Sequence, residues 1–417
     1  RLKDLGARVE IGHAEDNVWE ADVVITSTAI GGDNPEVRAA RKRGIPVIRR
    51  AEMLAELMRL KYGIAVAGTH GKTTTTSLTS AVLAEGGIDP TIVIGGKLKS
   101  ISSNARLGDG EYLVAEADES DGSFLKLMPT IGVVTNIDEE HLDHWHGGID
   151  EIEEAFINFV NKVPFYGCAV MCLDHPRVQS ILPKIERKIL TYGLSPQADY
   201  AASNVMARED GVDFTVRRHG DELGRVELAM IGVHNVQNAL AAIAVADEIG
   251  VDFSAIQKAL AEFEGISRRF EEKGRFGDVV VVDDYGHHPE EILATLRAAR
   301  ASSNRRLVVA FQPHRYTRTR DLMDEFAKSF NACHELVLAD VYAAGEVPII
   351  DADSKKMVEK IRDFGHHGVR YGGDLDGVLR VLQEVVEPGD MVITLGAGDI
   401  YKVGERLLET MGEGSFR

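Results

Sequence analysis

The sequence predicts an α/β fold divided into three domains. Short apolar strands alternate with helices along the chain, which is the pattern of parallel sheets covered by helices. A length of 417 residues fits two or three domains at about 150 residues each. We place the N-terminal domain at residues 1–61, the central domain at 62–265 and the C-terminal domain at 266–417.

The N-terminal domain has the pattern of a truncated Rossmann-like unit. We expect short strands at 8–11, 22–25 and 46–48 and a helix over 34–43. A complete unit of this kind opens with a strand and a G-x-G-x-x-G loop, and no such loop precedes Gly68. We therefore expect the opening of this domain to be missing from the numbering.

The central domain is expected to be a parallel sheet of the P-loop type. It begins with an apolar strand over 63–67, a glycine loop and a helix that ends near Gly86. Later strands are expected at 91–94, 112–115, 131–135 and 168–173, and an Ala-rich helix over 235–249. Polar and apolar residues alternate over 190–230, which predicts a small antiparallel insertion.

The C-terminal domain is expected to be a second doubly wound, Rossmann-like sheet. Residues 266–269 have the character of a linker. Strands are expected at 279–282, 307–311, 335–338 and 391–395, with helices between them.

Composition limits the function classes. Lys and Arg number 47 against 66 Asp and Glu, a formal charge of −19, which argues against a surface for nucleic acid or anionic membranes. Cys168, Cys172 and Cys333 are too few for a disulfide framework, and we expect reduced core residues. No apolar run reaches the roughly 20 residues of a membrane span and no signal segment opens the chain, so we expect a cytoplasmic protein.

A glycine loop between the first central strand and its helix predicts a phosphate site. Backbone N–H groups of such a turn converge on an anion, Lys72 adds charge, and the Thr73 hydroxyl can bind Mg²⁺. Val66 occupies the position of the first P-loop glycine, so the motif is incomplete. The residues expected to contact phosphates are Gly68, Thr69, His70, Gly71, Lys72, Thr73 and Thr74.

Two acidic loops follow the next central strands. Four carboxylates occur in residues 116–121, and Glu116 is the favoured Mg²⁺ ligand because it comes directly after a strand. Residues 138–154 hold eight carboxylates and no Lys or Arg, together with His141, His144 and His146. One of these histidines could bind a second ion or act as a base, and their spacing alone leaves open which.

The C-terminal domain carries polar motifs at the ends of two strands. Residues 283–289 read DDYGHHP, which is either a functional loop or a capping turn. Residues 312–320 read QPHRYTRTR, with Arg315 and Arg318 three apart. Arginine pairs hold carboxylate or phosphate groups, so we expect an anion clamp, with a basic helix face as the alternative. Gly396-Ala397-Gly398 lacks the third glycine of a dinucleotide site and is interpreted as a structural turn.

Together these motifs resemble the Mur ligases, ATP-dependent amino-acid ligases of bacterial peptidoglycan precursor synthesis. The resemblance runs from Thr26 to Gly398 in the family's order. It implies that L-alanine is joined to the lactyl carboxylate of UDP-N-acetylmuramate through an acyl phosphate, giving ADP and phosphate. It also implies a bacterial cytoplasmic enzyme, and we expect a monomer or weak homodimer.

The resemblance implies roles for individual residues. Lys72 is similar to the lysine that contacts ATP phosphates, Thr73 and Glu116 to ligands of one Mg²⁺, and His141 to the ligand of a second, with Mn²⁺ able to substitute. Asn235 and Asn238 resemble an adenine-contacting element, with Asn238 preferred. The residues expected to close over the nucleotide are Arg269, Asp284 and Tyr285.

Amino-acid and sugar-nucleotide contacts are implied less directly. Arg315, Arg318 and His288 resemble the group that handles the amino acid and the product carboxylate. The uridine nucleotide would rest on Ser27, Thr28, Arg106 and Ser120.

Three other functions remain open from the residues. A related ligase could join a preformed peptide to the same sugar nucleotide, or another amino acid to a different precursor. A P-loop kinase or ATPase would need no end-of-strand histidines and arginines in two further α/β units, which argues against it. A nucleotide-responsive module without activity would need no catalytic carboxylates.

Overall fold

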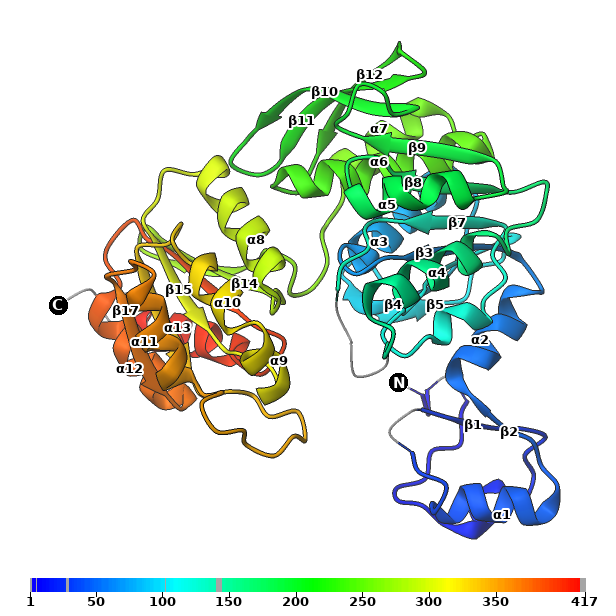
Figure 1. Ribbon diagram of the computed structural model, residues 1–417, viewed down its shortest axis with the longest axis horizontal. Helices are drawn as coiled ribbons and strands as arrows, with labels where there is room; N and C mark the ends of the chain where they lie inside the picture. The colour runs from blue at the N-terminus through cyan, green and yellow to red at the C-terminus, as the bar shows by residue number, and fades with distance from the viewer. Residues whose placement is uncertain (1, 5, 28–29, 102, 140–144, 413–417) are drawn as a thin grey trace.

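The computed structural model describes residues 2–4, 6–27, 30–101, 103–139 and 145–412. Within these residues the strands form three sheets, of two, ten and six strands, in the order of the three predicted domains. The six-stranded part lies on one side of the molecule in Figure 1, and the ten-stranded part lies opposite with the small N-terminal part beneath it. The α/β class is therefore confirmed.

The N-terminal part is a small parallel β/α unit. Strand β1 (Val24–Thr26) pairs in parallel with β2 (Val47–Arg49). The helices are η1 (Glu15–Val18), α1 (Pro35–Arg43) and α2 (Arg50–Met58). The Asn34 side chain accepts from the Glu36 N–H and caps α1. The strand expected at 8–11 is wrong, because these residues are mostly exposed and join no sheet within the described chain.

The middle part is a ten-stranded mixed sheet in the order β12-β11-β10-β9-β8-β7-β3-β6-β4-β5. Its strands are β3 (Tyr62–Ala67), β4 (Thr91–Leu98), β5 (Ser103–Arg106), β6 (Tyr112–Glu116), β7 (Ile131–Val134), β8 (Cys168–Cys172), β9 (Ile189–Gly193), β10 (Tyr200–Ala207), β11 (Val212–Arg218) and β12 (Asp221–Leu228). The antiparallel strands expected over 190–230 exist, but they extend the main sheet, because β10 pairs in parallel with β9.

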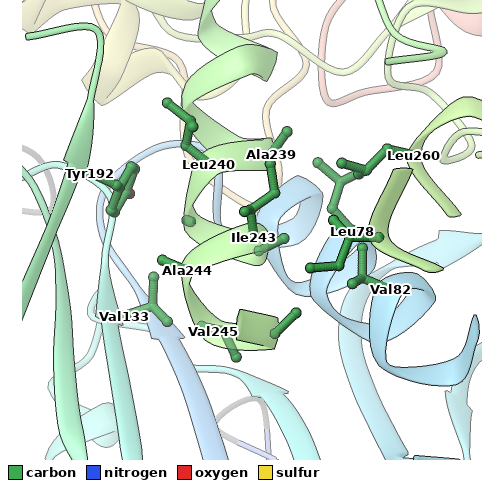
Figure 2. Packing of buried hydrophobic residues seen from close by; sticks show 14 of the residues in the cluster. Leu78, Val82, Val133, Tyr192, Ala239, Leu240, Ile243, Ala244, Val245 and Leu260 are labelled. Atoms are coloured by element: carbon green, nitrogen blue, oxygen red, sulfur yellow. The ribbon is translucent and has the colours of Figure 1, made fainter. Parts of the chain in front are cut away.

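Helices cover both faces of this sheet. They are α3 (Lys72–Glu85), η2 (Ser123–Lys126), α4 (Gly148–Val160), α5 (Pro176–Ile181), η3 (Leu182–Lys184), α6 (Val233–Ile249) and α7 (Phe253–Ala261). Leu78 and Val82 of α3 lie beside Ala239 and Ile243 of α6 in Figure 2, all fully buried. The small alanine side chains of α6 let it approach α3 and the sheet closely, so the N-terminus of α3 sits on a tightly packed base.

The C-terminal part is a six-stranded sheet, order β13-β14-β18-β15-β16-β17, parallel except for β13. The strands are β13 (Glu271–Phe276), β14 (Val279–Asp284), β15 (Leu307–Phe311), β16 (Glu335–Ala339), β17 (Val369–Gly373) and β18 (Met391–Leu395). The helices are α8 (Pro289–Ser302), α9 (Tyr316–Asp321), α10 (Met323–Ser329), α11 (Ser354–Asp363), α12 (Leu375–Val385) and α13 (Tyr401–Gly412). Separate apolar clusters fill its two faces.

The two larger sheets direct their carboxyl ends toward a shared interface. The helix α8 lies on the side of the C-terminal part that faces the middle part in Figure 1. Leu98 of β4 forms a bridge with Ile266 of the linker, and His70 of the glycine loop lies 3.8 Å from Glu291 of α8. None of the described helices combines the length and apolar character needed to cross a membrane.

Candidate active site

The glycine loop between β3 and α3 has a backbone that only glycine accommodates easily. Gly68 has φ +136° and Gly71, which caps α3, has φ +80°. A Cβ on Gly68 would lie 2.0 Å from Thr135 Oγ1, and one on Gly71 would lie 2.7 Å from Asn238 Oδ1. Both positions therefore combine a left-handed or near-left-handed conformation with close packing.

Residues after β7 hold this loop in place. The His70 N–H donates to Asn136 Oδ1 at 2.7 Å, and Thr135 Oγ1 donates to the His70 carbonyl at 2.6 Å. The Asp138 N–H donates to Thr69 Oγ1 at 2.8 Å. The loop is thus fixed before any anion binds, as the phosphate-site prediction requires.

Lys72 begins α3 and is surrounded by acceptors. Its ammonium lies 2.8 Å from Glu119 Oε2 and donates to the carbonyls of Gly68 at 2.6 Å and Thr69 at 3.1 Å. Burial lowers the pKa of Lys72, but Glu119, Glu116 and Asp118 outweigh it and leave the pKa above its ordinary value. Burial raises the pKa of Glu119 to about 7 despite the lysine. Lys72 is therefore a charged donor that Glu119 holds beside the loop.

Thr73 and Glu116 are adjacent, as a shared metal would require. Thr73 Oγ1 donates to Glu116 Oε2 at 3.0 Å, and the same carboxylate oxygen accepts from the Gly95 N–H at 2.8 Å. Hydroxyl and carboxylate oxygens are ligands that suit Mg²⁺, which commonly completes its shell with phosphate and water. These two residues fit Mg²⁺ beside the phosphate loop. His141, expected at a second ion, lies outside the described residues.

A cavity of about 370 Å³, which we call the amide cavity, lies between the middle and C-terminal parts beside this loop. Asn238 Nδ2 donates to Asn235 Oδ1 at 3.0 Å, and Asn238 Oδ1 accepts from Thr75 Oγ1 at 3.1 Å. Tyr192 and Ile231 add apolar surface. An apolar slot with fixed amides suits a flat heteroaromatic ring.

The linker and the loop after β14 form the opposite side of the amide cavity. Asp284 accepts the N–H groups of Phe270 and Gly286, each at 2.8 Å, and burial raises the pKa of its carboxyl. Arg269 lies 5.4 Å from the Tyr285 ring and lines the cavity with Asp284. The three residues expected to close over a nucleotide are thus neighbours in the structure.

Arg268, the neighbour of Arg269, binds to the C-terminal sheet and the turn that follows β18. Its guanidinium donates to Asp283 at 2.9 Å and to the Gly398 carbonyl at 3.1 Å. The Gly396–Gly398 segment is therefore a turn that holds the linker onto the C-terminal sheet, which agrees with its interpretation as a structural turn.

A second cavity of about 400 Å³, which we call the phosphate-loop cavity, lies between the middle part and the C-terminal part. The middle part contributes Lys72, Thr73 and Glu116. The C-terminal part contributes Tyr285, His287, Glu291 and Arg318, and the linker contributes Arg269. A cation-rich wall thus faces the proposed metal and phosphate wall.

Of the residues predicted to hold the amino acid, Arg315, Arg318 and His288, the structure places only Arg318 on the phosphate-loop cavity. Arg318 lines the phosphate-loop cavity, whereas Arg315 is exposed and is the N-cap residue of α9, with φ +70°. His288 is buried, and its ring lies 5.0 Å from the His70 ring. His287, and not the predicted His288, lines the phosphate-loop cavity.

Sequence reasoning missed Glu119, His287 and Glu291. Glu119 was one of four carboxylates in a short loop, and its pairing with Lys72 depends on the packing of β6 against β3. His287 was adjacent to the histidine that we predicted. Glu291 is the third residue of α8, and its carboxylate accepts the N–H of the N-cap residue His288 at 3.3 Å, so a capping box was its available signal.

Residues predicted for the sugar nucleotide lie apart from these cavities in the described structure. Arg106 pairs with Asp89 near the start of β4, and the Ser120 N–H donates to Asp118 Oδ1 at 3.1 Å. Ser27 is exposed, and its carbonyl accepts from Arg49 Nη1 at 3.1 Å. Thr28 lies outside the described residues. These four assignments remain predictions.

Comparisons with known proteins agree along the whole chain. Family models match in three ranges: the Mur ligase family catalytic domain over 1–62, the Mur ligase middle domain over 66–246, and the Mur ligase glutamate ligase domain over 268–398. A UDP-N-acetylmuramate–L-alanine ligase of Syntrophotalea carbinolica is 55% identical over 98% of this chain and 89% of the relative. The enzyme of that name from Geobacter sulfurreducens is 54% identical over 99% of this chain and 90% of the relative.

Solved structures agree as well. The UDP-N-acetylmuramate–alanine ligase of Thermotoga maritima has a TM-score of 0.81 at 28% identity, covering 98% of this chain and 89% of its own. A murein peptide ligase of Psychrobacter arcticus has a TM-score of 0.69 at 25% identity, covering 100% of this chain and 91% of its own.

Proposed function

The chain belongs to the Mur ligase family, and on that premise we propose that it joins L-alanine to UDP-N-acetylmuramate at the expense of ATP in peptidoglycan precursor synthesis. The observation that carries this proposal is the phosphate-loop cavity. It sets Lys72, Thr73 and Glu116 opposite Arg269 and Arg318. This arrangement suits phosphoryl transfer on one wall and an anionic second substrate on the other.

The first step activates the sugar carboxylate. An oxygen of the lactyl carboxylate attacks the γ-phosphorus of ATP, the bond to the bridging β,γ-oxygen breaks, and an acyl phosphate and ADP form. Anionic groups approach one another here, so charge neutralisation by Lys72 lowers the barrier. Thr73 and Glu116 would hold Mg²⁺, which would supply further neutralisation of phosphate oxygens when bound, and His141 would hold a second ion.

The second step forms the amide. Arg318 binds the carboxylate of alanine, and Arg315 is the further candidate for this role, together with His288. The amine attacks the acyl carbon and phosphate leaves. Closure of the C-terminal part onto the middle part would exclude water that would hydrolyse the acyl phosphate.

The adenine ring fits the amide cavity, where Asn238 and Asn235 present fixed amides and Arg269 and Asp284 form the facing side. Tyr285 lies beside Arg269 and lines the phosphate-loop cavity. The loop from Gly68 to Thr74 would hold the phosphates. Residues 1–61 would bind the uridine nucleotide through Ser27 and Thr28, with Arg106 and Ser120 contributing from 62–265, and residues 266–417 would bind alanine. We further propose a cytoplasmic bacterial enzyme that acts as a monomer or weak homodimer.

An amino-acid and peptide panel tests this function. With ATP, Mg²⁺ and UDP-N-acetylmuramate, alanine should support ADP formation and yield the UDP-N-acetylmuramoyl-alanine product by mass spectrometry. A preference for a preformed tripeptide would identify a peptide ligase. ADP formation that ignores the sugar nucleotide would indicate a simple ATPase and contradict the proposal.

A further inference from the structure

His287 has a fixed orientation on the C-terminal wall of the phosphate-loop cavity. Its Nδ1 lies 3.1 Å from the Tyr285 carbonyl oxygen. A carbonyl oxygen can only accept a hydrogen bond, so Nδ1 carries the proton and Nε2 keeps its lone pair in the neutral ring. Within the part of the chain that the structure describes, no hydrogen bond occupies Nε2.

The surroundings of His287 keep the ring neutral. The pKa of His287 is lowered to about 4, chiefly by burial, with Arg318 and His314 also lowering it against the opposing charge of Glu291. Glu291 Oε2 lies 3.4 Å from Nδ1, and the His314 ring centroid lies 5.7 Å away. The Tyr285 ring packs edge-on at 5.4 Å. At neutral pH the ring is therefore an unprotonated acceptor beside a carboxylate that would stabilise its charged form.

Other bases on this cavity lining are already engaged. Glu116 accepts from Thr73 at 3.0 Å on the metal side, and Glu291 accepts the His287 N–H at 3.0 Å with its other oxygen 3.6 Å from Arg269. His70 belongs to the phosphate loop and lies 3.4 Å from Asp138. His287 shares the C-terminal wall with Arg318, where the amino acid would dock.

We propose that Nε2 of His287 accepts the proton that the ammonium group of the amino-acid substrate must lose before it can attack. This inference rests on the proposed ligase function and adds a catalytic residue to it. Glu291 is a positioning residue, which holds the His287 backbone and offsets the imidazolium charge.

The proton balance is complete without another reagent. The ammonium passes one proton to Nε2, and its freed lone pair forms the C–N bond to the acyl carbon. The tetrahedral intermediate then breaks its C–O bond to phosphate, and the second nitrogen proton leaves with the departing phosphate. The imidazolium returns its proton to solvent when the cavity opens. The cations Lys72 and Arg318 near the amine favour its neutral form.

Hydroxylamine separates this role from binding or folding. Hydroxylamine is largely unprotonated at pH 7 and attacks an acyl phosphate to give a hydroxamate, so it needs no base to release its lone pair. His287→Gln should lower kcat with saturating alanine by about 100-fold or more, with alanine KM within about threefold of wild type. Hydroxamate formation from ATP and UDP-N-acetylmuramate should stay within about threefold of wild type.

Two further variants sharpen the test. Glu291→Gln keeps the imidazole and should lower alanine turnover by about tenfold while hydroxamate formation persists. His367→Gln is the matched control, because His367 is exposed after α11, and it should behave as wild type. Undiminished alanine turnover in His287→Gln, or equal loss with both amines, would overturn the role of His287. A wild-type enzyme that makes neither amide nor hydroxamate would instead overturn the proposed function.

Discussion

The two walls of the phosphate-loop cavity are built differently. On the middle wall, Lys72, Thr73 and Glu116 are held by hydrogen bonds of 2.6–3.1 Å to the loop and to one another. On the C-terminal wall, Glu291 reaches Arg269 and His70 across 3.6 and 3.8 Å. The first set is formed before substrate binds, whereas these two contacts of Glu291 are longer than direct hydrogen bonds. Within its own wall, Glu291 accepts the His287 N–H at 3.0 Å.

The two walls of the phosphate-loop cavity also differ in the charge of their side chains. The middle wall keeps a buried ion pair, Lys72 with Glu119. The C-terminal wall keeps the imidazole of His287 neutral, since its pKa is lowered to about 4, chiefly by burial. A preorganised anion site therefore faces a wall that carries arginines and a neutral imidazole.

The largest effect is expected on the middle wall. Lys72→Ala removes the cation nearest the transferred phosphate and should lower phosphate release by about 1,000-fold, measured with ATP, UDP-N-acetylmuramate and alanine. Lys188→Ala, which removes a surface partner of Glu248 at 2.5 Å, is the matched control. Turnover close to wild type in Lys72→Ala would refute the site.

On the C-terminal wall the two arginines should differ. Arg318→Ala should raise the alanine KM by about 10- to 100-fold, because it removes a charged donor that lines the cavity. Arg315→Ala should have a smaller effect, because Arg315 is exposed in the present arrangement. ATP affinity, measured by fluorescence or calorimetry, should stay constant in both. A larger loss in Arg315→Ala would show that closure inverts their roles.

Stability should fall in acid through three half-buried histidines, of which His234 belongs to α6 and His287 and His314 to the C-terminal part. His234, His287 and His314 have folded pKa values lowered from 6.5 to about 4, and burial is the largest cause. The native state thus binds fewer protons than the unfolded state, so their stability contribution is complete above pH 6.5 and declines as pH falls toward 4. Each accounts for about 1–3 kcal/mol. Thermal unfolding should show this decline, and His234→Gln should flatten it; an unchanged curve in that variant would contradict the assignment.

The smallest effect tests the shape of the middle wall. Gly71→Ala should cost about 1–2 kcal/mol of stability, because it forces a side chain into a positive φ, and it should raise the ATP KM because the Cβ meets Asn238. Gly87→Ala is the control: its φ is +77° with open space around it. It should destabilise without changing the ATP KM. Equal KM values in the two variants would mean that the Asn238 contact is irrelevant to nucleotide binding.

The periodic parts of the fold could be predicted from the sequence. Strands β15 and β18 match the expected ranges of 307–311 and 391–395, because buried parallel strands form apolar runs with polar ends. Strand β13 and helix α2 were missed, because half-buried, charge-rich segments lack that contrast. The strand expected at 8–11 failed because an alternating pattern needs a partner strand.

The sequence by itself determined which residues lie at the ends of strands, and therefore which sheet edge would carry chemistry. Local backbone preferences and the hydrophobic period are enough to place residues at the ends of strands, and they placed Gly71, Lys72 and Glu116 there. Only the tertiary structure decided which side chains meet across the interface. The choice between His287 and His288, and between Arg318 and Arg315, depends on which of them reach the cavity when the C-terminal part packs against the middle part. The pairing of Lys72 with Glu119 likewise depends on the approach of two strands. Such contacts join residues distant in the chain, and no local pattern encodes their distance or burial.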